Sequence, residues 1–219
     1  MIAALYVVLF ILIIVSGTQK VMASENNKAL TVLNEKTPIH NIFAKGNVQV
    51  FISQGEEQEI KVGNNYYAQN ALTQVEGGTL RISSFEKEKL TVWVTVKDLR
   101  SVEAYDHALV YSLNQFRAID FKVTLGNQAV ALLDVQAFDL TTDISDSSKL
   151  KLKGSSEFHQ IVAHDSSNID VTKFTAQTEE LKLYDDSSIT LGNSKNSKTF
   201  ETKVVAQKLD KLEEIFSLQ

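Results

Sequence analysis

An internal repeat with a period of about 20 residues is the feature that most constrains the fold of this chain. Between residues 99 and 192, five segments share the pattern apolar-x-apolar-x-Asp/Asn-x-Ala/Ser-x-apolar, as in Ile161 to Ile169. Each unit is too short to bury its apolar side chains alone, so successive units must stack and pair their strands in parallel. The repeat therefore predicts an all-β fold, a parallel β-helix or β-solenoid with coils of about 20 residues.

One Asp or Asn recurs in each unit, in phase with the apolar residues that should point inward. A buried carboxylate would be unfavourable there. A sharp corner resolves the conflict, because Asn and Asp tolerate left-handed backbone better than any residue except Gly. The alternative is a carboxylate ladder that binds Ca²⁺ between coils, although the glycine-rich calcium-binding nonapeptide is absent and one position is a neutral Asn. The predicted corner residues, spaced 21, 19, 19 and 20 residues apart, are Asp106, Asn127, Asp146, Asp165 and Asp185.

Four of the segments that connect these units carry a phenylalanine. Rings at similar places in successive coils can stack on one another inside the molecule. The sequence therefore predicts an internal aromatic stack, with an exposed aromatic platform for a ligand as the alternative. The four residues are Phe116, Phe138, Phe158 and Phe174.

Residues 39–98 carry strand patterns of a more ordinary kind. Apolar residues alternate with others from Leu90 to Val96, which predicts a strand with one apolar face and Trp93 on the other. Gly77-Gly78 is a two-residue hairpin signal. We expect residues 39–98 to form an antiparallel β portion that belongs to the same domain as the repeat coils at 99–192. Within this portion, Tyr66 to Leu72 is expected to form a helical turn.

The last residues, 193–219, are expected to cap the final coil, because a solenoid needs a cover over its exposed end. A capping helix is the preferred form, and a final strand or a partner-binding helix are the alternatives. The residues that share one face of this predicted helix are Leu209, Leu212, Ile215 and Phe216.

The chain begins with a run of 14 apolar residues, Ile2 to Val15. This run is short for a membrane span, which needs about 20 residues, but it matches the apolar region of a signal peptide. Val21-Met22-Ala23 then resembles a cleavage site. Residues 1–23 are therefore predicted to be a signal peptide and 24–38 a linker, so export to the periplasm or cell surface is expected. If residues 1–23 are not cleaved, they would instead anchor the protein in the membrane. No other membrane contact is expected.

The order of these features resembles the head GIN domain of putative autotransporter adhesins, a family of Bacteroidetes-type bacteria. The resemblance runs from about Asn41 to Gly192, and matching stretches include Gly46 to Val50, Gly77 to Ile82 and Leu90 to Val96. Where the family usually has Gly at each corner, this chain has Asp or Asn. The resemblance implies a right-handed β-helix-like solenoid and an adhesin-like location at the surface or in the envelope.

No catalytic or cofactor-binding motif stands out in the sequence. The net charge of -5 argues against a nucleic-acid binder, and the absence of Cys excludes disulfides and thiolate metal sites. The four histidines lack metal-binding spacing, and neither a nucleophile elbow nor a phosphate-binding loop is present. No catalytic residue, cofactor or metal is therefore predicted, and a polysaccharide-acting β-helix enzyme is the least favoured function.

Amphipathic side chains at or near the corners are better candidates for binding. The alternative is that they are scattered exposed aromatics, which are normal on protein surfaces. The favoured function is an exported, non-enzymatic binding module for a surface glycan or an envelope protein, with an envelope scaffold as the alternative. The residues expected to form a binding strip along one edge are Tyr105, His107, Tyr111, His164 and Tyr184.

Overall fold

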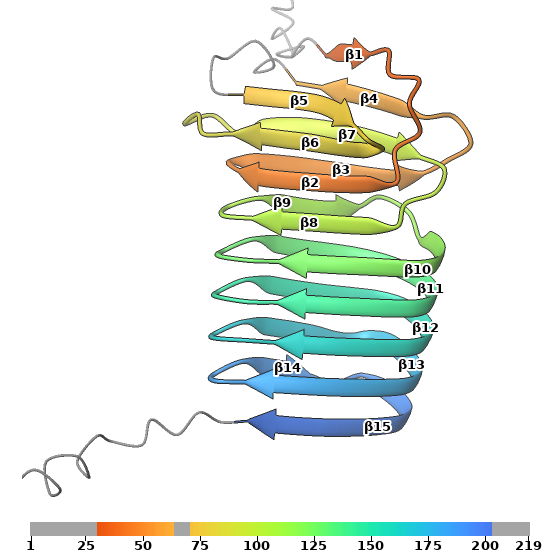
Figure 1. Cartoon of the computed structure of the whole chain (residues 1–219), viewed down its shortest axis with the longest axis vertical. Coiled ribbons are helices and arrows are strands. Elements are labelled where there is room, and N and C mark those ends of the chain that lie inside the picture. Colours follow the sequence, from red (N-terminus) through yellow and green to blue (C-terminus); the bar gives the residue numbers. More distant parts are fainter. Residues whose placement is uncertain (1–29, 64–70, 203–219) are drawn as a thin grey trace, which may run out of the picture.

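The computed structural model describes residues 30–63 and 71–202, which form one large, mostly parallel and strongly curled sheet of 15 strands (Figure 1). The all-β prediction is confirmed, and no helix among these residues is long and apolar enough to cross a membrane. The predicted signal peptide, most of the predicted helical turn and the predicted C-terminal helix lie outside the described residues. The strands are β1 (Thr31–Leu33), β2 (Asn41–Gly46), β3 (Val48–Gln54), β4 (Glu59–Val62), β5 (Ala71–Glu76), β6 (Thr79–Ser84), β7 (Leu90–Val96), β8 (Ser101–Tyr105), β9 (Leu109–Ser112), β10 (Phe116–Leu125), β11 (Val130–Ile144), β12 (Lys149–Ala163), β13 (Asn168–Tyr184), β14 (Ser188–Thr190) and β15 (Asn193–Thr202).

Each unit of the repeat forms one rung, meaning the segment from one corner residue to the next. Neighbouring rungs pair in parallel, so that Val130 of β11 lies beside Lys149 of β12, which lies beside Asn168 of β13. The corners follow one edge of the molecule, and a bend within β10 to β13 follows the opposite edge (Figure 1). Each rung therefore folds back at the bend, and residues at equivalent positions form columns that run along the stack.

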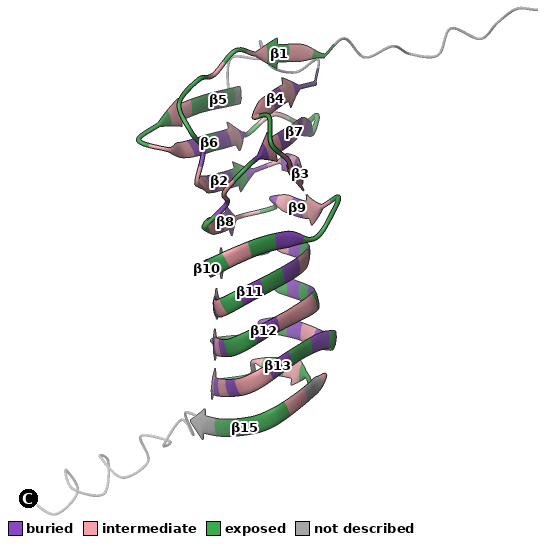
Figure 2. Ribbon diagram, turned by 90° about the vertical axis from the view of Figure 1, so that its right-hand side faces the viewer, coloured by how far each residue is buried: buried purple, intermediate pink, exposed green. Residues whose placement is uncertain are grey.

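The core lies between the two sides of the curled sheet (Figure 2). Alternate residues of each strand point inward, because successive side chains of a strand point to opposite faces. In β7, Leu90, Val92, Val94 and Val96 are buried, whereas Trp93 is half-buried on the outer face, as the alternation predicts. The same pattern continues from rung to rung and produces one continuous apolar core.

The N-terminal portion is not the antiparallel unit that the sequence predicts. β2 pairs in parallel with β6 and β8, and β3 pairs in parallel with β7 and β9. Among the described residues, the antiparallel pairs are β1 with β4, β4 with β7, and β5 with β6, the last closed by the predicted Gly77-Gly78 hairpin. The prediction was wrong because period-two alternation reports which face is buried and is the same for both strand directions. The expected linker also contains β1.

The predicted internal stack of phenylalanines is wrong for two of its four members. Phe116 and Phe174 are buried in the inward column that also holds Val135 and Gly154. Phe138 and Phe158 lie on the outside of the bend and are 56% and 42% exposed, with ring centroids 5.5 Å apart in an edge-to-face contact. The bend is responsible, because it changes which sequence positions face inward.

Rungs differ in length, and the extra residues of the longer rungs lie away from the corners. The first rung has two more residues than the next, and they lie between Tyr111 and Phe116, because the pairing offset changes there from 21 to 19 residues. The fourth rung has one more residue than the third, and it lies in a bulge of β13 between Asp170 and Lys173. The corner residues consequently stay in one column despite spacings of 19 to 21 residues.

Candidate functional site

The five predicted corner residues share one backbone conformation. Their φ angles lie between 55° and 60°, and they are the non-glycine residues with positive φ in the described part of the chain: Asp106, Asn127, Asp146, Asp165 and Asp185. Each corner is closed by a turn bond between backbone groups three residues apart, such as the Ala108 N–H donating to the Tyr105 carbonyl at 3.2 Å. Left-handed backbone strains most side chains and is tolerated by Asp and Asn.

The corner side chains also link successive rungs. The backbone N–H of Asn127 donates to Asp146 Oδ2 at 2.7 Å, and the N–H of Asp146 donates to Asp165 Oδ2 at 3.2 Å. At the first step, the Asn127 side-chain amide donates to Asp106 Oδ1 at 2.6 Å. This ladder gives a reason for Asp at a corner where Gly would also fit, because Gly has no acceptor for the N–H above it.

Substitution of Asp146 should separate the two roles of a corner residue, which are to adopt left-handed backbone and to accept a hydrogen bond from the neighbouring rung. Asp146→Ala should lower the free energy of unfolding by about 2–3 kcal/mol, since Ala is strained at positive φ and lacks the acceptor. Asp146→Gly should cost about 1 kcal/mol, because only the acceptor is lost. Asp146→Asn keeps both and serves as the control. Urea denaturation measures the series, and an Ala variant as stable as the Gly variant would contradict the conformational role.

Four of the five residues of the expected binding strip are next to corner residues, but they do not form one continuous row. Tyr105, His164 and Tyr184 each precede a corner, and Gly126 and Ser145 occupy the same position in the two rungs between Tyr105 and His164. His164 stacks on Tyr184 with ring centroids 4.6 Å apart and an interplanar angle of 5°. Burial beside Glu103 raises the pKa of Tyr105, whose ring contacts Phe43.

The other two strip residues lie elsewhere. His107 follows its corner and is exposed, whereas Tyr111 lies on the outer face of β9. There the Tyr111 ring stacks on Phe51, which stacks on Trp93, with centroid distances of 5.5 and 5.7 Å. A binding role for these five residues stays a prediction.

A groove crosses the rungs just after the bend, with a volume of about 470 Å³. Its floor is a column of small residues, in which Ala118, Ala137 and Ser156 lie side by side on β10, β11 and β12. Ser156 is only 6% exposed, and its Oγ atom has no hydrogen-bond partner within the described structure. The Ser156 Oγ atom is itself shielded from solvent, so this residue packs with the alanines of the column and the floor of the groove is closed.

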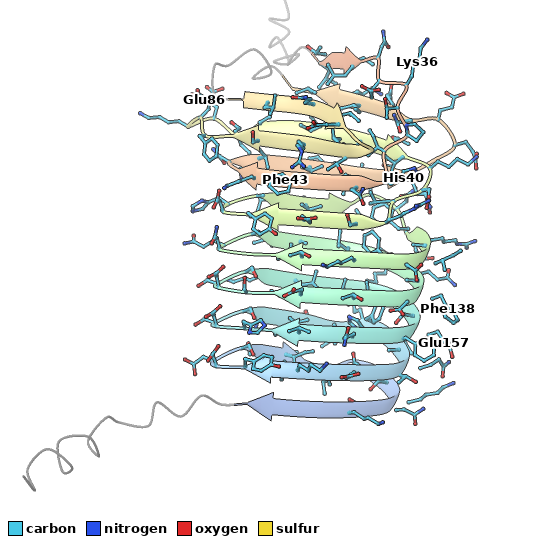
Figure 3. All side chains as sticks on the ribbon, in the orientation of Figure 1. Lys36, His40, Phe43, Glu86, Phe138 and Glu157 are labelled. Atoms are coloured by element: carbon cyan, nitrogen blue, oxygen red, sulfur yellow. The ribbon has the colours of Figure 1, made fainter. Side chains whose placement is uncertain are left out.

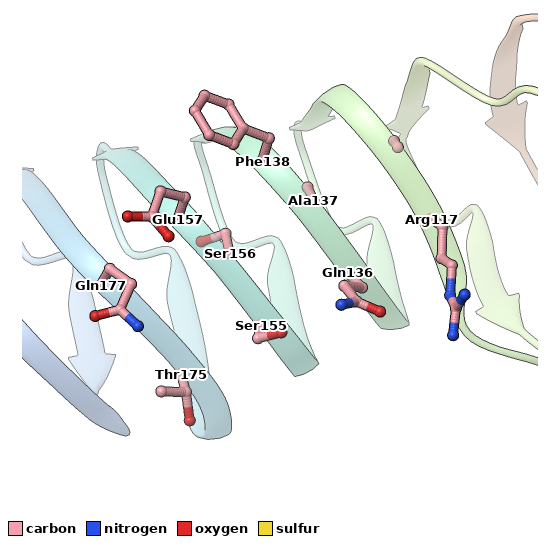
Figure 4. Close-up of a pocket in the computed structure, with 10 residues that line it drawn as sticks. Arg117, Gln136, Ala137, Phe138, Ser155, Ser156, Glu157, Thr175 and Gln177 are labelled. Atoms are coloured by element: carbon pink, nitrogen blue, oxygen red, sulfur yellow. The ribbon is translucent and has the colours of Figure 1, made fainter.

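Two rows of larger side chains flank this floor (Figure 4). One row is polar and follows the strand register from Arg117 through Gln136 and Ser155 to Thr175. The other row contains Phe138, Glu157 and Gln177, and two of its members, Phe138 and Glu157, project from the molecule at the bend (Figure 3). The groove thus combines hydroxyl and amide groups with one exposed aromatic ring.

The groove was not predicted from the sequence because its residues carry no chemical motif. A signal was nevertheless present: Arg117, Gln136, Ser155 and Thr175 recur at spacings of 19, 19 and 20 residues, matching the corners. Alignment of the connecting segments as well as the corner segments would have placed these side chains in one column.

A second hollow of about 320 Å³ lies before the bend and is rich in lysine. Lys151 Nζ lies 2.7 Å from Asp170 Oδ2, and Lys153 Nζ lies 2.9 Å from Asp134 Oδ2. The bond from Lys151, with further bonds from Thr172, holds the pKa of Asp170 well below its usual range. Because these lysines already have carboxylate partners, the hollow is a weaker candidate for anion binding than its lysine content suggests.

A buried His–Glu pair lies inside the rungs formed by β12 and β13. His159 and Glu179 are 2% and 3% exposed, and His159 Nδ1 lies 3.3 Å from Glu179 Oε1, close but not aligned as a hydrogen bond. Nε2 of His159 lies 3.1 Å from the Thr142 hydroxyl, and the ring meets Phe174 edge on. Burial lowers the pKa of His159, against the opposing effect of Glu179. Over the described ranges, no group of three or more His, Cys, Asp or Glu side chains could hold a metal ion.

Comparison with known families gives one match. The model described as “Putative auto-transporter adhesin, head GIN domain” matches residues 40–211, most of the chain. No curated protein matches. The matched range includes the corners, the groove and the buried pair.

Solved structures share this fold at low sequence identity. A “putative lipid binding protein” from Parabacteroides distasonis is 12% identical, with a TM-score of 0.59 over 82% of this chain and 93% of the other. A putative adhesin from Bacteroides fragilis is 15% identical, with a TM-score of 0.57 over 80% and 96%. Another, from Parabacteroides merdae, is 13% identical, with a TM-score of 0.53 over 81% and 98%. At such identities the likeness concerns the fold alone.

Proposed function

The chain belongs to the head GIN domain family of putative auto-transporter adhesins, and we propose that it is an exported, non-enzymatic binding module of the cell envelope whose ligand lies in the groove at the bend. The family description and the predicted signal peptide support the location. The descriptions of the family and of its solved relatives name no catalytic activity. The parallel rungs support a right-handed β-solenoid as the finer description of the fold.

The groove carries this proposal through one observation, the row of polar side chains that lines it in strand register: Arg117, Gln136, Ser155 and Thr175. Such a row offers hydrogen-bond donors and acceptors on four neighbouring strands. An exposed ring on the other side of the floor, Phe138, adds the kind of contact surface that is enriched in binding sites. The paired rings of His164 and Tyr184 at the corner edge offer a flat surface but no hollow among those described.

Binding by the purified protein to a panel of surface glycans and envelope or matrix proteins tests the proposal. Phe138→Ala should weaken each specific interaction about tenfold, the effect of losing roughly 1.4 kcal/mol of aromatic contact. The matched control is Phe85→Ala, because Phe85 is 65% exposed and lies in a different hollow, with corner residue Asp106. Equal effects of the two substitutions would remove the groove as the ligand site. Binding that is insensitive to Phe138→Ala but lost on Tyr184→Ala would move the site to the corner edge.

A further inference from the structure

We propose that the groove takes a straight, neutral oligosaccharide chain that runs along the stack of rungs, with about one sugar unit per rung. This inference rests on the proposed function and specifies its ligand. The groove crosses β10 to β13, and strands in a sheet are about 4.8 Å apart. The four polar residues of one row therefore span about 14 Å from first to last, a length suited to three or four sugar units.

The chemistry of the lining favours a neutral and hydroxylated ligand. Gln136, Ser155, Thr175 and Gln177 offer amide and hydroxyl groups that both donate and accept hydrogen bonds. The charged lining residues, Arg117 and Glu157, are one of each sign, so the lining has no net charge. Phe138 adds an apolar surface for the C–H face of a sugar ring. A groove for an acyl chain would lack this row of polar groups, and one for an acidic polymer would carry excess positive charge.

The floor between the two rows is closed and made of small residues. Ala118, Ala137, Ser156 and Ala176 lie side by side in one column, and the Ser156 Oγ atom is shielded from solvent. The outward side chains of the two flanking rows are therefore the groups that a ligand in the groove would meet.

The register of the groove favours an extended chain over a curved one. Arg117, Gln136, Ser155 and Thr175 are direct neighbours in consecutive strand pairs, so they form a straight line across the strands. Chains with β-1,4 links are extended and repeat at a distance close to the strand spacing, whereas α-1,4-linked chains coil. The structure therefore predicts selection for β-1,4-linked neutral chains.

Calorimetric titration of the full-length protein with defined oligomers tests this inference. The probes are β-1,4-linked oligomers of glucose and of N-acetylglucosamine with two to six units, α-1,4-linked glucose oligomers, and oligogalacturonates as acidic chains. Affinity for at least one β-1,4-linked series should rise at least tenfold from two to four units and then level off. Ser155→Ala and Gln136→Ala should each weaken binding of the four-unit probe about fivefold, as expected for one lost hydrogen bond. Ser156→Ala is the matched control and should leave the affinity unchanged, because its Oγ atom is shielded from the groove.

Several outcomes would overturn the inference and leave the proposed function standing. One is that a protein of the panel binds in the groove while neither neutral oligosaccharide series binds. Another is that the acidic or α-1,4-linked chains bind more tightly than the neutral β-1,4-linked chains. A third is that affinity does not change with the number of sugar units. An equal loss of affinity on Ser155→Ala and Ser156→Ala would also overturn it. Loss of the proposed function itself would look different, since no ligand of the panel would then respond to Phe138→Ala.

Discussion

Gly154→Ala is expected to lower the free energy of unfolding by about 3 kcal/mol or more, a large effect for a single methyl group. Gly154 stands at the bend of β12 with a φ of 112°, a conformation that side chains rarely adopt. A Cβ atom there would lie 2.9 Å from the Val135 carbonyl carbon and closer still to its oxygen. These are backbone atoms of the neighbouring rung, so β11 and β12 would have to separate. Urea denaturation followed by circular dichroism measures the loss.

The control for this substitution is Gly77→Ala. Gly77 also has positive φ, at 56°, but a Cβ atom there meets nothing within 4 Å. That variant should lose only the conformational term of about 1–2 kcal/mol. Equal losses at the two glycines would mean that φ alone decides the effect and that the close approach of the rungs at the bend is unimportant.

His159→Leu is expected to lower the free energy of unfolding by about 3 kcal/mol, because it removes the contact with the Thr142 hydroxyl and leaves buried Glu179 without its polar neighbour. The carboxylate of Glu179 would remain buried without the imidazole that lies 3.3 Å away. Glu179→Leu should cost less, because burial already favours the neutral form of His159. The double variant should be more stable than the sum of the single effects predicts, since two apolar side chains replace the pair.

The same residue should make stability depend on pH. Because burial lowers the pKa of His159, the unfolded chain binds a proton at that site more readily than the folded protein. The contribution of neutral His159 is complete above its ordinary pKa of about 6.5 and is lost as the pH falls from there toward the lowered folded value. The charged group that faces the ring, Glu179, opposes this loss, and the other close neighbours, Thr142 and Phe174, do not ionise in this range.

Comparison of the natural protein with His159→Leu isolates this effect, because His40, His107 and His164 remain in both. The difference between their unfolding free energies should shrink as the pH falls from 7 to 5, by up to about 1.4 kcal/mol per pH unit. A difference that stays constant over this interval would contradict a buried, neutral His159.

The corners could be predicted from sequence because their conformation restricts residue type. Only a few residues tolerate φ near 58°, so the requirement leaves Asp or Asn at each position, as at Asp146. The bend is not marked by a recurring residue type in the sequence, because the backbone turns differently there in different rungs. β12 uses Gly154, β13 contains a bulge, and the first rung has two extra residues before Phe116. The inward or outward direction of Phe138 therefore could not be read from its spacing.

The direction of the N-terminal strands and the groove were beyond prediction for different reasons. Strand direction depends on where the chain crosses between the two sides of the sheet, and apolar alternation does not record it. The groove arises from ordinary residues such as Gln136 and Ser155, whose significance comes from register. Residues of this kind become recognisable only when the columns are known.

The ladder of corner residues has a consequence for how such a chain can change over evolutionary time. The corner column stays aligned although rungs of 19, 20 and 21 residues follow one another. A deletion or insertion between two corners is thus confined to the rung in which it occurs and does not shift the phase of those that follow. Residues near the bend can therefore change in number and type, because the corner residues align the rungs again once per rung. One edge of the molecule can thus diversify without loss of the strand pairing that stabilises the stack.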